Sequence, residues 1–98
     1  VHVHCKDVRP QVVATARNDG WSFLNGVING TFTVPGDGTI DFDAILATLH
    51  AAGYEGWLVV EAEQDPAVAP SYAYASKGYR TLRAIVDRLN AGAAARAA

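Results

Sequence analysis

Two short stretches of the chain have the hydrophobic pattern of β-strands. In residues 1–7, apolar and polar side chains alternate, which predicts a strand with one apolar face. Val1, Val3 and Cys5 would lie on that face, and His2, His4 and Lys6 on the other. In residues 57–63, the run Trp57 to Val60 follows Gly56 without a polar break, which is typical of a buried strand.

Two longer stretches have helical periodicity. After Asp41 or Asp43 as N-cap, apolar residues recur until Gly53, which predicts a helix with one apolar stripe: Ile45, Leu46 and Leu49. A second helix is predicted from about Pro70 to Asn90, with its stripe at Tyr72, Tyr79, Leu82, Ile85, Val86 and Leu89. Four basic residues lie largely off that stripe and are interpreted as a solvated face: Lys77, Arg80, Arg83 and Arg88.

The segment between residues 9 and 40 has the composition of loops and short helices. Pro10 suits a first helical turn before residues 11–17, and Ser22 is a plausible N-cap for a second short helix over residues 23–28. Residues 31–34 are expected to be extended. The Gly36-Asp37-Gly38 turn lacks the Gly-x-x-x-x-Gly-Lys spacing of a phosphate loop, so a plain turn before a helix is the simplest interpretation.

The predicted order, strand, helical region, helix, strand, helix, indicates an α/β fold. Two strands joined through a helix pair in parallel through a right-handed crossover, and parallel sheets carry helices on their faces. Residues 1–90 would form this unit. Residues 91–98 are alanine-rich and are expected to form a disordered tail.

Composition limits the classes of function that the chain can serve. It has 98 residues, of which 50% are hydrophobic, and a net charge of −2. A globular α/β domain without a nucleic-acid or membrane partner is therefore expected. The single cysteine, Cys5, suits a reducing compartment, and we expect a cytoplasmic protein. The chain enters its first strand at Val1 without a polar lead-in, and we expect it to be part of a longer polypeptide.

Two positions carry candidate chemistry. Glu61 follows the buried run, and catalysis in parallel βα barrels occurs where the strands end at their carboxyl side. Glu61 could equally be a structural carboxylate that pairs with a neighbouring strand. His2 and His4, at i and i+2 on one strand face, have a reasonable metal-ligand spacing, but surface or core histidines have the same pattern.

Three motifs together resemble a known family. They are residues 2–9 (His-Val-His-Cys-Lys-Asp-Val-Arg), residues 32–42 (Phe-Thr-Val-Pro-Gly-Asp-Gly-Thr-Ile-Asp-Phe) and residues 53–66, which include Val-Val-Glu-Ala-Glu-Gln-Asp-Pro. From Val1 to about Leu89, the chain resembles the C-terminal part of the myo-inosose-2 dehydratases. These belong to the sugar phosphate isomerase/epimerase superfamily of xylose-isomerase-like barrels. The resemblance implies about the last two βα units of a TIM (β/α)8 barrel.

The resemblance also implies a divalent-metal site, with Mn²⁺ or Co²⁺ as the expected ion. By this resemblance, His4 and Glu61 are metal ligands, and Lys6 and Glu61 are catalytic. His2, Lys6 and Arg9 would bind the substrate or order its loop, and Glu63 would support the site as a neighbouring carboxylate. The remaining ligands would lie outside these 98 residues.

The reaction implied is the loss of water from 2-keto-myo-inositol, a cyclic polyol ketone, to give a cyclic dione. Two alternatives stay open. The protein could be a ketose isomerase or epimerase of the same superfamily. It could also be a short non-catalytic chain that assembles with itself into a homo-oligomer, because half of its residues are hydrophobic.

Overall fold

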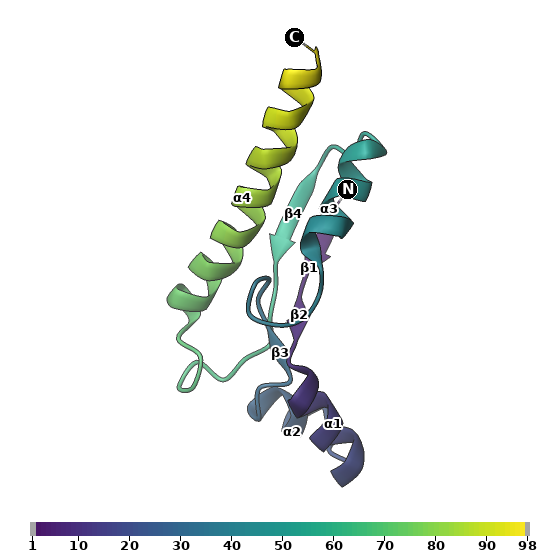
Figure 1. Ribbon diagram of the computed structural model, residues 1–98. Helices are drawn as coiled ribbons and strands as arrows, with labels where there is room; N and C mark the ends of the chain where they lie inside the picture. The colour runs from purple at the N-terminus through teal and green to yellow at the C-terminus, as the bar shows by residue number, and fades with distance from the viewer. Residues whose placement is uncertain (1, 98) are drawn as a thin grey trace.

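Two parallel strands and two helices that pack on them form the body of the molecule. A computed structural model describes residues 2–97, and side-chain surroundings up to residue 92. Strand β1 (His2–Cys5) pairs with β4 (Trp57–Val60), while α3 (Phe42–Ala51) and α4 (Ser71–Ala97) pack against each other and the sheet. Figure 1 shows α4 running beside β4, while α1 and α2 lie beyond the start of α4 at the other end of the molecule. The predicted α/β order and parallel pairing are therefore confirmed for these elements.

The register of the sheet decides which side chains share a face. Val3 lies opposite Leu58, and Cys5 lies opposite Val60. These four side chains pack with the helices around a core of Cys5, Phe42, Leu46, Leu82 and Ile85. His2 pairs with Trp57 and His4 with Val59, and because side chains alternate along a strand, these four lie on the opposite face.

The prediction of a fully buried strand at residues 57–60 was wrong at its start. Trp57 is 69% exposed, and the other three residues of β4 are only partly buried. The physical reason is that helices cover one face of this sheet and not the other, within the residues that the structure describes. The expected strand also ends earlier: β4 stops at Val60, although the Glu61 N–H still donates to the Cys5 carbonyl at 3.1 Å.

The first predicted strand is divided into two parts. After β1, the chain bends at Lys6 and continues as β2 (Asp7–Val8), which pairs antiparallel with β3 (Phe32–Thr33). In the chain, α1 (Pro10–Asp19) and α2 (Phe23–Ile28) lie between β2 and β3. Ser22 is the N-cap of α2, as predicted, and its side chain accepts a hydrogen bond from the Asn25 N–H. Figure 1 shows this β2–β3 excursion beyond the carboxyl ends of β1 and β4. Val1 lies outside the described residues.

The two larger helices keep part of their predicted stripes. Asp41, not Asp43, caps α3 by accepting from the Ala44 N–H. Leu46 is buried, but Ile45 is 42% exposed because it lies at the edge of the face that meets the sheet. On α4, Leu82 and Ile85 are buried, whereas two tyrosines expected on the stripe, Tyr72 and Tyr79, are exposed.

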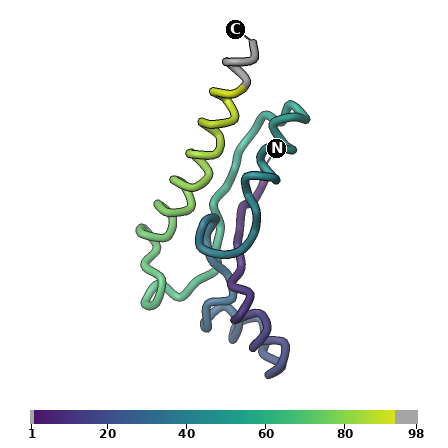
Figure 2. Tube along the Cα trace, viewed as in Figure 1, coloured from purple at the N-terminus to yellow at the C-terminus, as the bar shows by residue number. Residues whose placement is uncertain are grey.

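The last helix is longer than predicted. The trace in Figure 2 follows α4 as a single rod toward the C-terminus, and its bounds are Ser71–Ala97 rather than about 70–90. Alanine has the highest intrinsic helix propensity, which favours continuation of the helix through the alanine-rich residues 91–97. Ala98 lies outside the described residues, and the domain division at residue 90 stays a prediction.

Candidate functional site

Four polar side chains gather where β1 and β4 end. Lys6 follows β1 directly, Glu61 follows β4 directly, and Glu63 lies two residues further along. His4 lies within β1 on the face away from the helices. Parallel strands end at the same edge of a sheet. Lys6 and Glu63 therefore lie beside each other, although they are 57 positions apart in the sequence.

These side chains form one connected network. The Lys6 ammonium donates to both carboxylate oxygens of Glu63, at 2.9 and 2.8 Å, and lies 3.2 Å from Glu61 Oε1. The other oxygen of Glu61 contacts His4 Nδ1. Glu61 thus uses one oxygen for the lysine and the other for the histidine. The side chains of Lys6 and Glu61 are about one-third exposed, so the network is open to a ligand.

The network also sets the ionisation of its members. The hydrogen bond to Glu63 is the largest cause that raises the pKa of Lys6, with a smaller contribution from Glu61 and an opposing one from burial. The hydrogen bond from Lys6 lowers the pKa of Glu61; burial opposes this shift, and His4 adds to it. Lys6 therefore stays a cation and Glu61 stays a carboxylate around neutral pH.

The donor set fits half of a metal centre. A histidine nitrogen beside a carboxylate oxygen is a ligand combination that suits first-row divalent metals such as Mn²⁺ and Co²⁺. However, residues 2–97 contain no group of three or more histidine, cysteine, aspartate or glutamate side chains that could enclose an ion. His4 and Glu61 could hold a metal only together with ligands from outside the described residues.

His2 and Arg9, which the resemblance links to the substrate, lie apart from this network. His2 is exposed at the beginning of β1, on the same face as His4 but further from the carboxyl end. The Arg9 guanidinium donates to the Gly30 carbonyl at 2.8 Å, to Thr33 at 3.3 Å and to Asp37 at 2.8 Å. These contacts tie Arg9 to the loop, which supports the loop-ordering half of its expected role.

The Gly36-Asp37-Gly38 turn is more than a plain connection. Asp37 accepts hydrogen bonds from Arg9, from Thr33 at 2.7 Å and from Lys77 on α4 at 2.7 Å. Burial alone would raise its pKa, but the hydrogen bonds from Lys77, Thr33 and Arg9 outweigh burial and lower the pKa to about 2. Lys77 therefore does not belong only to a solvated face; it joins α4 to the turn.

A second carboxylate, Asp7, shapes the backbone after that turn. Its side chain is 1% exposed, and Oδ1 accepts from the N–H groups of Val8, Thr39 and Ile40 at 2.8, 2.9 and 3.0 Å. Gly38 approaches so closely that a Cβ there would lie 2.2 Å from Asp7 Oδ1. Glycine is thus required at position 38, and Asp7 fixes the path into α3.

Sequence reasoning missed one aromatic residue of the site. The Phe32 ring lies 5.2 Å from the Lys6 ammonium, and its centroid is 5.5 Å from that of Phe23. Phe32 belongs to a two-residue strand, which has no periodicity to indicate where its side chain points. The only available signal was its place three residues before the Pro35 turn, and this does not predict contact with Lys6.

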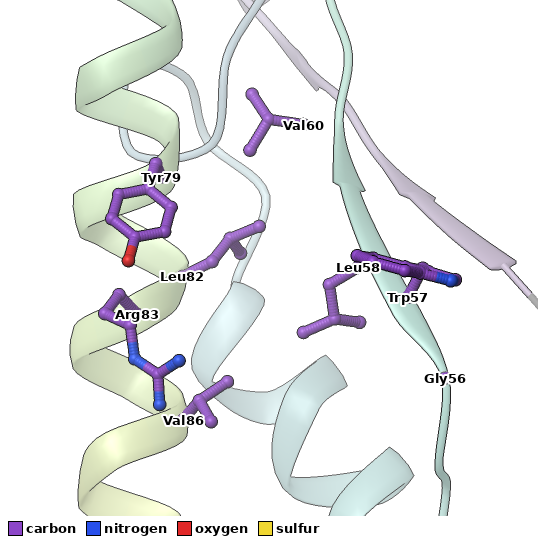
Figure 3. A pocket seen from close by; sticks show the side chains of 8 residues that line it. All are labelled: Gly56, Trp57, Leu58, Val60, Tyr79, Leu82, Arg83 and Val86. Carbon is purple, nitrogen blue, oxygen red and sulfur yellow. The ribbon is translucent and has the colours of Figure 1, made fainter.

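The apolar groove between β4 and α4 does not coincide with the polar network. Figure 3 shows Leu58 and Val60 pointing from the strand side toward the helix. The groove has a volume of about 340 Å³. Its one charged side chain, Arg83, is paired with Asp87. None of the predicted site residues lines this groove, so the chemistry of the chain is expected at the strand ends and not there.

Similar sequences give this geometry a family context. Over 82 residues the chain is 58% identical to an inosose dehydratase of Klebsiella pneumoniae subsp. pneumoniae. The matched region covers 84% of this chain and 27% of the relative. It is 56% identical over 85 residues to an inosose dehydratase of Histophilus somni, and 52% identical over 82 residues to one of Clostridium botulinum. The chain spans slightly more than a quarter of the length of these curated relatives.

No helix within residues 2–97 has both the length and the apolar character of a membrane span.

A family model supports the relationship to the inosose dehydratases. The model for the xylose isomerase-like TIM barrel matches residues 1–85 of the 98. This match includes β1, β4 and every residue of the polar network. The chain therefore belongs to the xylose isomerase-like TIM barrel family.

Proposed function

We propose that the chain is part of a cytoplasmic inosose dehydratase, a lyase that removes water from 2-keto-myo-inositol. One observation carries this proposal: the His4–Glu61–Lys6 network lies at the carboxyl ends of two parallel strands, where barrels of this family type carry their active sites. The names and identities of the relatives supply the substrate class. The chain would form about the last two βα units of the barrel, and further ligands would come from the other units.

In the reaction, a proton leaves the carbon beside the ketone. The hydroxyl group on the next carbon departs with its bonding electrons and takes up a proton to become water, and the remaining enol reverts to a ketone. The chain supplies a cation and a carboxylate for these events. Lys6 is suited to donate a hydrogen bond to an oxygen that gains negative charge, because its raised pKa keeps it protonated; the same shift makes it a weak proton donor.

Glu61 is suited to a different task. A carboxylate whose pKa is lowered is a weak base but a good ligand and a good partner for positive charge. His4 and Glu61 would hold a divalent metal, Mn²⁺ or Co²⁺, whose chemistry when bound is to polarise the ketone and acidify the neighbouring C–H bond. A metal shared by the two side chains would replace their present contact.

The experiment that tests the proposal is an assay of the protein at its natural length. With Mn²⁺ or Co²⁺ and 2-keto-myo-inositol, mass spectrometry should detect a product lighter than the substrate by one water. His4→Ala and Glu61→Ala should each lower kcat/KM by about 100-fold or more, as expected when a charge-stabilising group is removed. Glu55→Gln, an exposed carboxylate before β4, serves as the matched control and should retain activity.

Full activity in both alanine variants would show that the site assignment is wrong. The family match itself favours a second candidate, a ketose isomerase or epimerase, because the family model is named for a sugar isomerase. Epimerisation of a ketose without dehydration of the inosose would establish this candidate instead.

The uncovered sheet face favours a third candidate, a non-catalytic chain that assembles with itself. Trp57 is 69% exposed there, and Phe23 and Leu24 on α2 are 67% and 66% exposed. Sedimentation of the 98-residue chain tests this: a monomer that unfolds cooperatively would exclude self-assembly. The intact mass of the natural protein then shows whether these residues form the whole polypeptide or a part of it.

A further inference from the structure

The Lys6 ammonium is contacted by three groups from two segments of the chain. Glu63, after β4, accepts hydrogen bonds with both of its carboxylate oxygens. Glu61 accepts at a longer distance, 3.2 Å, with one oxygen. The Phe32 ring, from β3, faces the ammonium at 5.2 Å. A long, flexible lysine side chain is thus restricted from several sides next to the candidate metal ligand.

We propose that Glu63 and Phe32 are positioning residues that hold Lys6 beside Glu61 for the reaction. The inference rests on the proposed function for its catalytic consequence, but the restraint on Lys6 can be tested separately. Glu63 contributes the stronger restraint, since both of its oxygens are within 2.9 Å of the ammonium. Glu61 alone would leave the lysine one long contact, and its other oxygen is already used by His4.

The two restraints act by different physical means. An ion pair with two short hydrogen bonds fixes both the distance and the direction of the ammonium. A cation over an aromatic face is attracted by the ring quadrupole and is tolerant of direction, so Phe32 limits the lysine mainly to one side. The Phe32 ring in turn contacts the ring of Phe23, with 5.5 Å between the centroids. We therefore expect the loss of Glu63 to have the larger effect.

The kinetic test compares Glu63→Gln with Glu55→Gln in the dehydration assay on the protein at its natural length. Misplacement of a reacting group by about 1 Å costs roughly 100-fold, so Glu63→Gln should lower kcat about 10- to 100-fold. KM should stay within about two-fold of the wild-type value, because the restraint acts on the reacting geometry and not on ground-state binding. Glu55→Gln should change neither parameter.

The aromatic restraint has its own pair of variants. Phe32→Leu keeps an apolar side chain but removes the ring, and kcat should fall about three-fold. Phe32→Trp keeps a π face and should restore kcat to near the wild-type value. Tyr72→Leu, which removes an aromatic ring that is 86% exposed at the start of α4, is the control and should have no effect.

A spectroscopic readout separates this inference from the proposed function. In protein labelled with ¹⁵N-lysine, the Lys6 ammonium should give a resolved signal because two carboxylates slow its exchange with water; Lys6→Arg identifies that signal. Glu63→Gln should abolish it, while the Lys77 signal persists because Lys77 pairs with Asp37. Persistence of the Lys77 signal in Glu63→Gln shows that the contact between α4 and the Asp37 turn is intact.

The outcomes are distinguishable. If Glu63→Gln leaves the Lys6 signal or kcat unchanged, the positioning role is refuted while the dehydratase proposal stands. If the unmodified protein does not dehydrate the inosose, the proposed function fails, and loss of the Lys6 signal in Glu63→Gln would still establish that Glu63 restrains the lysine.

Discussion

The two faces of the β1–β4 sheet differ although they are built from alternate residues of the same strands. The face toward α3 and α4 carries Val3, Cys5, Leu58 and Val60, and it is closed by the apolar core. The opposite face carries exposed or partly exposed side chains, including His4 and Trp57. The first face thus holds the structure together, and the second leads to the polar network at the strand ends.

Because side chains alternate, residues that stabilise the fold and residues that lead to the polar network are neighbours along each strand. A substitution on the helix-covered face removes apolar contacts that the helices cannot replace. A substitution on the open face removes polar groups that the core does not use. The predictions below test that separation, in order of the size of the expected effect.

The largest effect on stability is expected for Leu82→Ala. Leu82 is 4% exposed within the core, so its truncation should lower the free energy of unfolding by about 2 to 5 kcal/mol. Urea unfolding followed by circular dichroism measures this change. Tyr79→Ala on the same helix is the control; Tyr79 is 59% exposed and should cost less than about 1 kcal/mol. Equal losses would contradict the assignment of the covered face.

A smaller effect is expected where α4 crosses the sheet at Gly78. A Cβ at this position would lie 2.7 Å from Val60 Cγ1 and 3.1 Å from Val34 Cβ. Helix propensity alone predicts that Gly78→Ala stabilises the protein by about 1 kcal/mol. We expect instead a loss of about 1 to 2 kcal/mol, because the added methyl group would force α4 away from β4.

The control for this variant is Ala73→Gly at an exposed position of the same helix. It should cost about 1 kcal/mol through propensity alone. A stabilising Gly78→Ala would show that α4 does not pack closely on β4, and it would remove the basis for calling that face covered.

The third prediction concerns Asp37, which connects α4 to the loops at the open end of the sheet. Its pKa in the folded protein is about 2, below the ordinary value of 3.8. Its contribution to stability is therefore complete above about pH 4 and is lost as the pH falls toward 2. Because its side chain is 22% exposed and Lys77 is 45% exposed, we expect about 1 kcal/mol after allowance for solvent screening.

Unfolding of the wild type and Asp37→Asn should be compared between pH 6 and pH 2.5. The stability difference between the two proteins should shrink by more than half of this contribution of about 1 kcal/mol, because pH 2.5 still lies slightly above the folded pKa. A constant difference would show that the charge of Asp37 does not contribute to stability, and that other contacts join the loops to α4.

The smallest effect is expected for Trp57→Ser in the 98-residue chain. The side chain is 69% exposed, so the free energy of unfolding should change by less than about 0.5 kcal/mol. In the protein at its natural length, a larger loss would show that further strands cover this face. A loss of 2 kcal/mol or more in the 98-residue chain itself would contradict the open face.

Much of the fold followed from local pattern. Alternation in residues 2–5, the apolar run at 57–60 and the helical stripes around Leu46 and Leu82 predicted the correct elements and their parallel order. These signals are local, since strand and helix periodicity are read within a few residues. The family was likewise evident from three motifs and is confirmed by the match to residues 1–85.

Other features depend on distant contacts and had no local signal. The exposure of Trp57 follows from which face the helices cover, and the contact of Phe32 with Lys6 follows from the bend between β1 and β2. The role of Lys77 follows from the position of the Asp37 turn, 40 residues away. Each of these requires two segments to be placed in space, and a pattern along one segment cannot supply that placement.

Residue type and spacing were enough to predict the order of the main strands and helices, the family and the candidate residues, although not every boundary. Only the tertiary structure decided that Glu61 uses one oxygen for Lys6 and the other for His4, and that Glu63 holds Lys6 with both of its oxygens. The physical reason is the parallel pairing of β1 with β4. It brings two strand ends to one edge of the sheet, where charges far apart in the chain come within hydrogen-bonding distance.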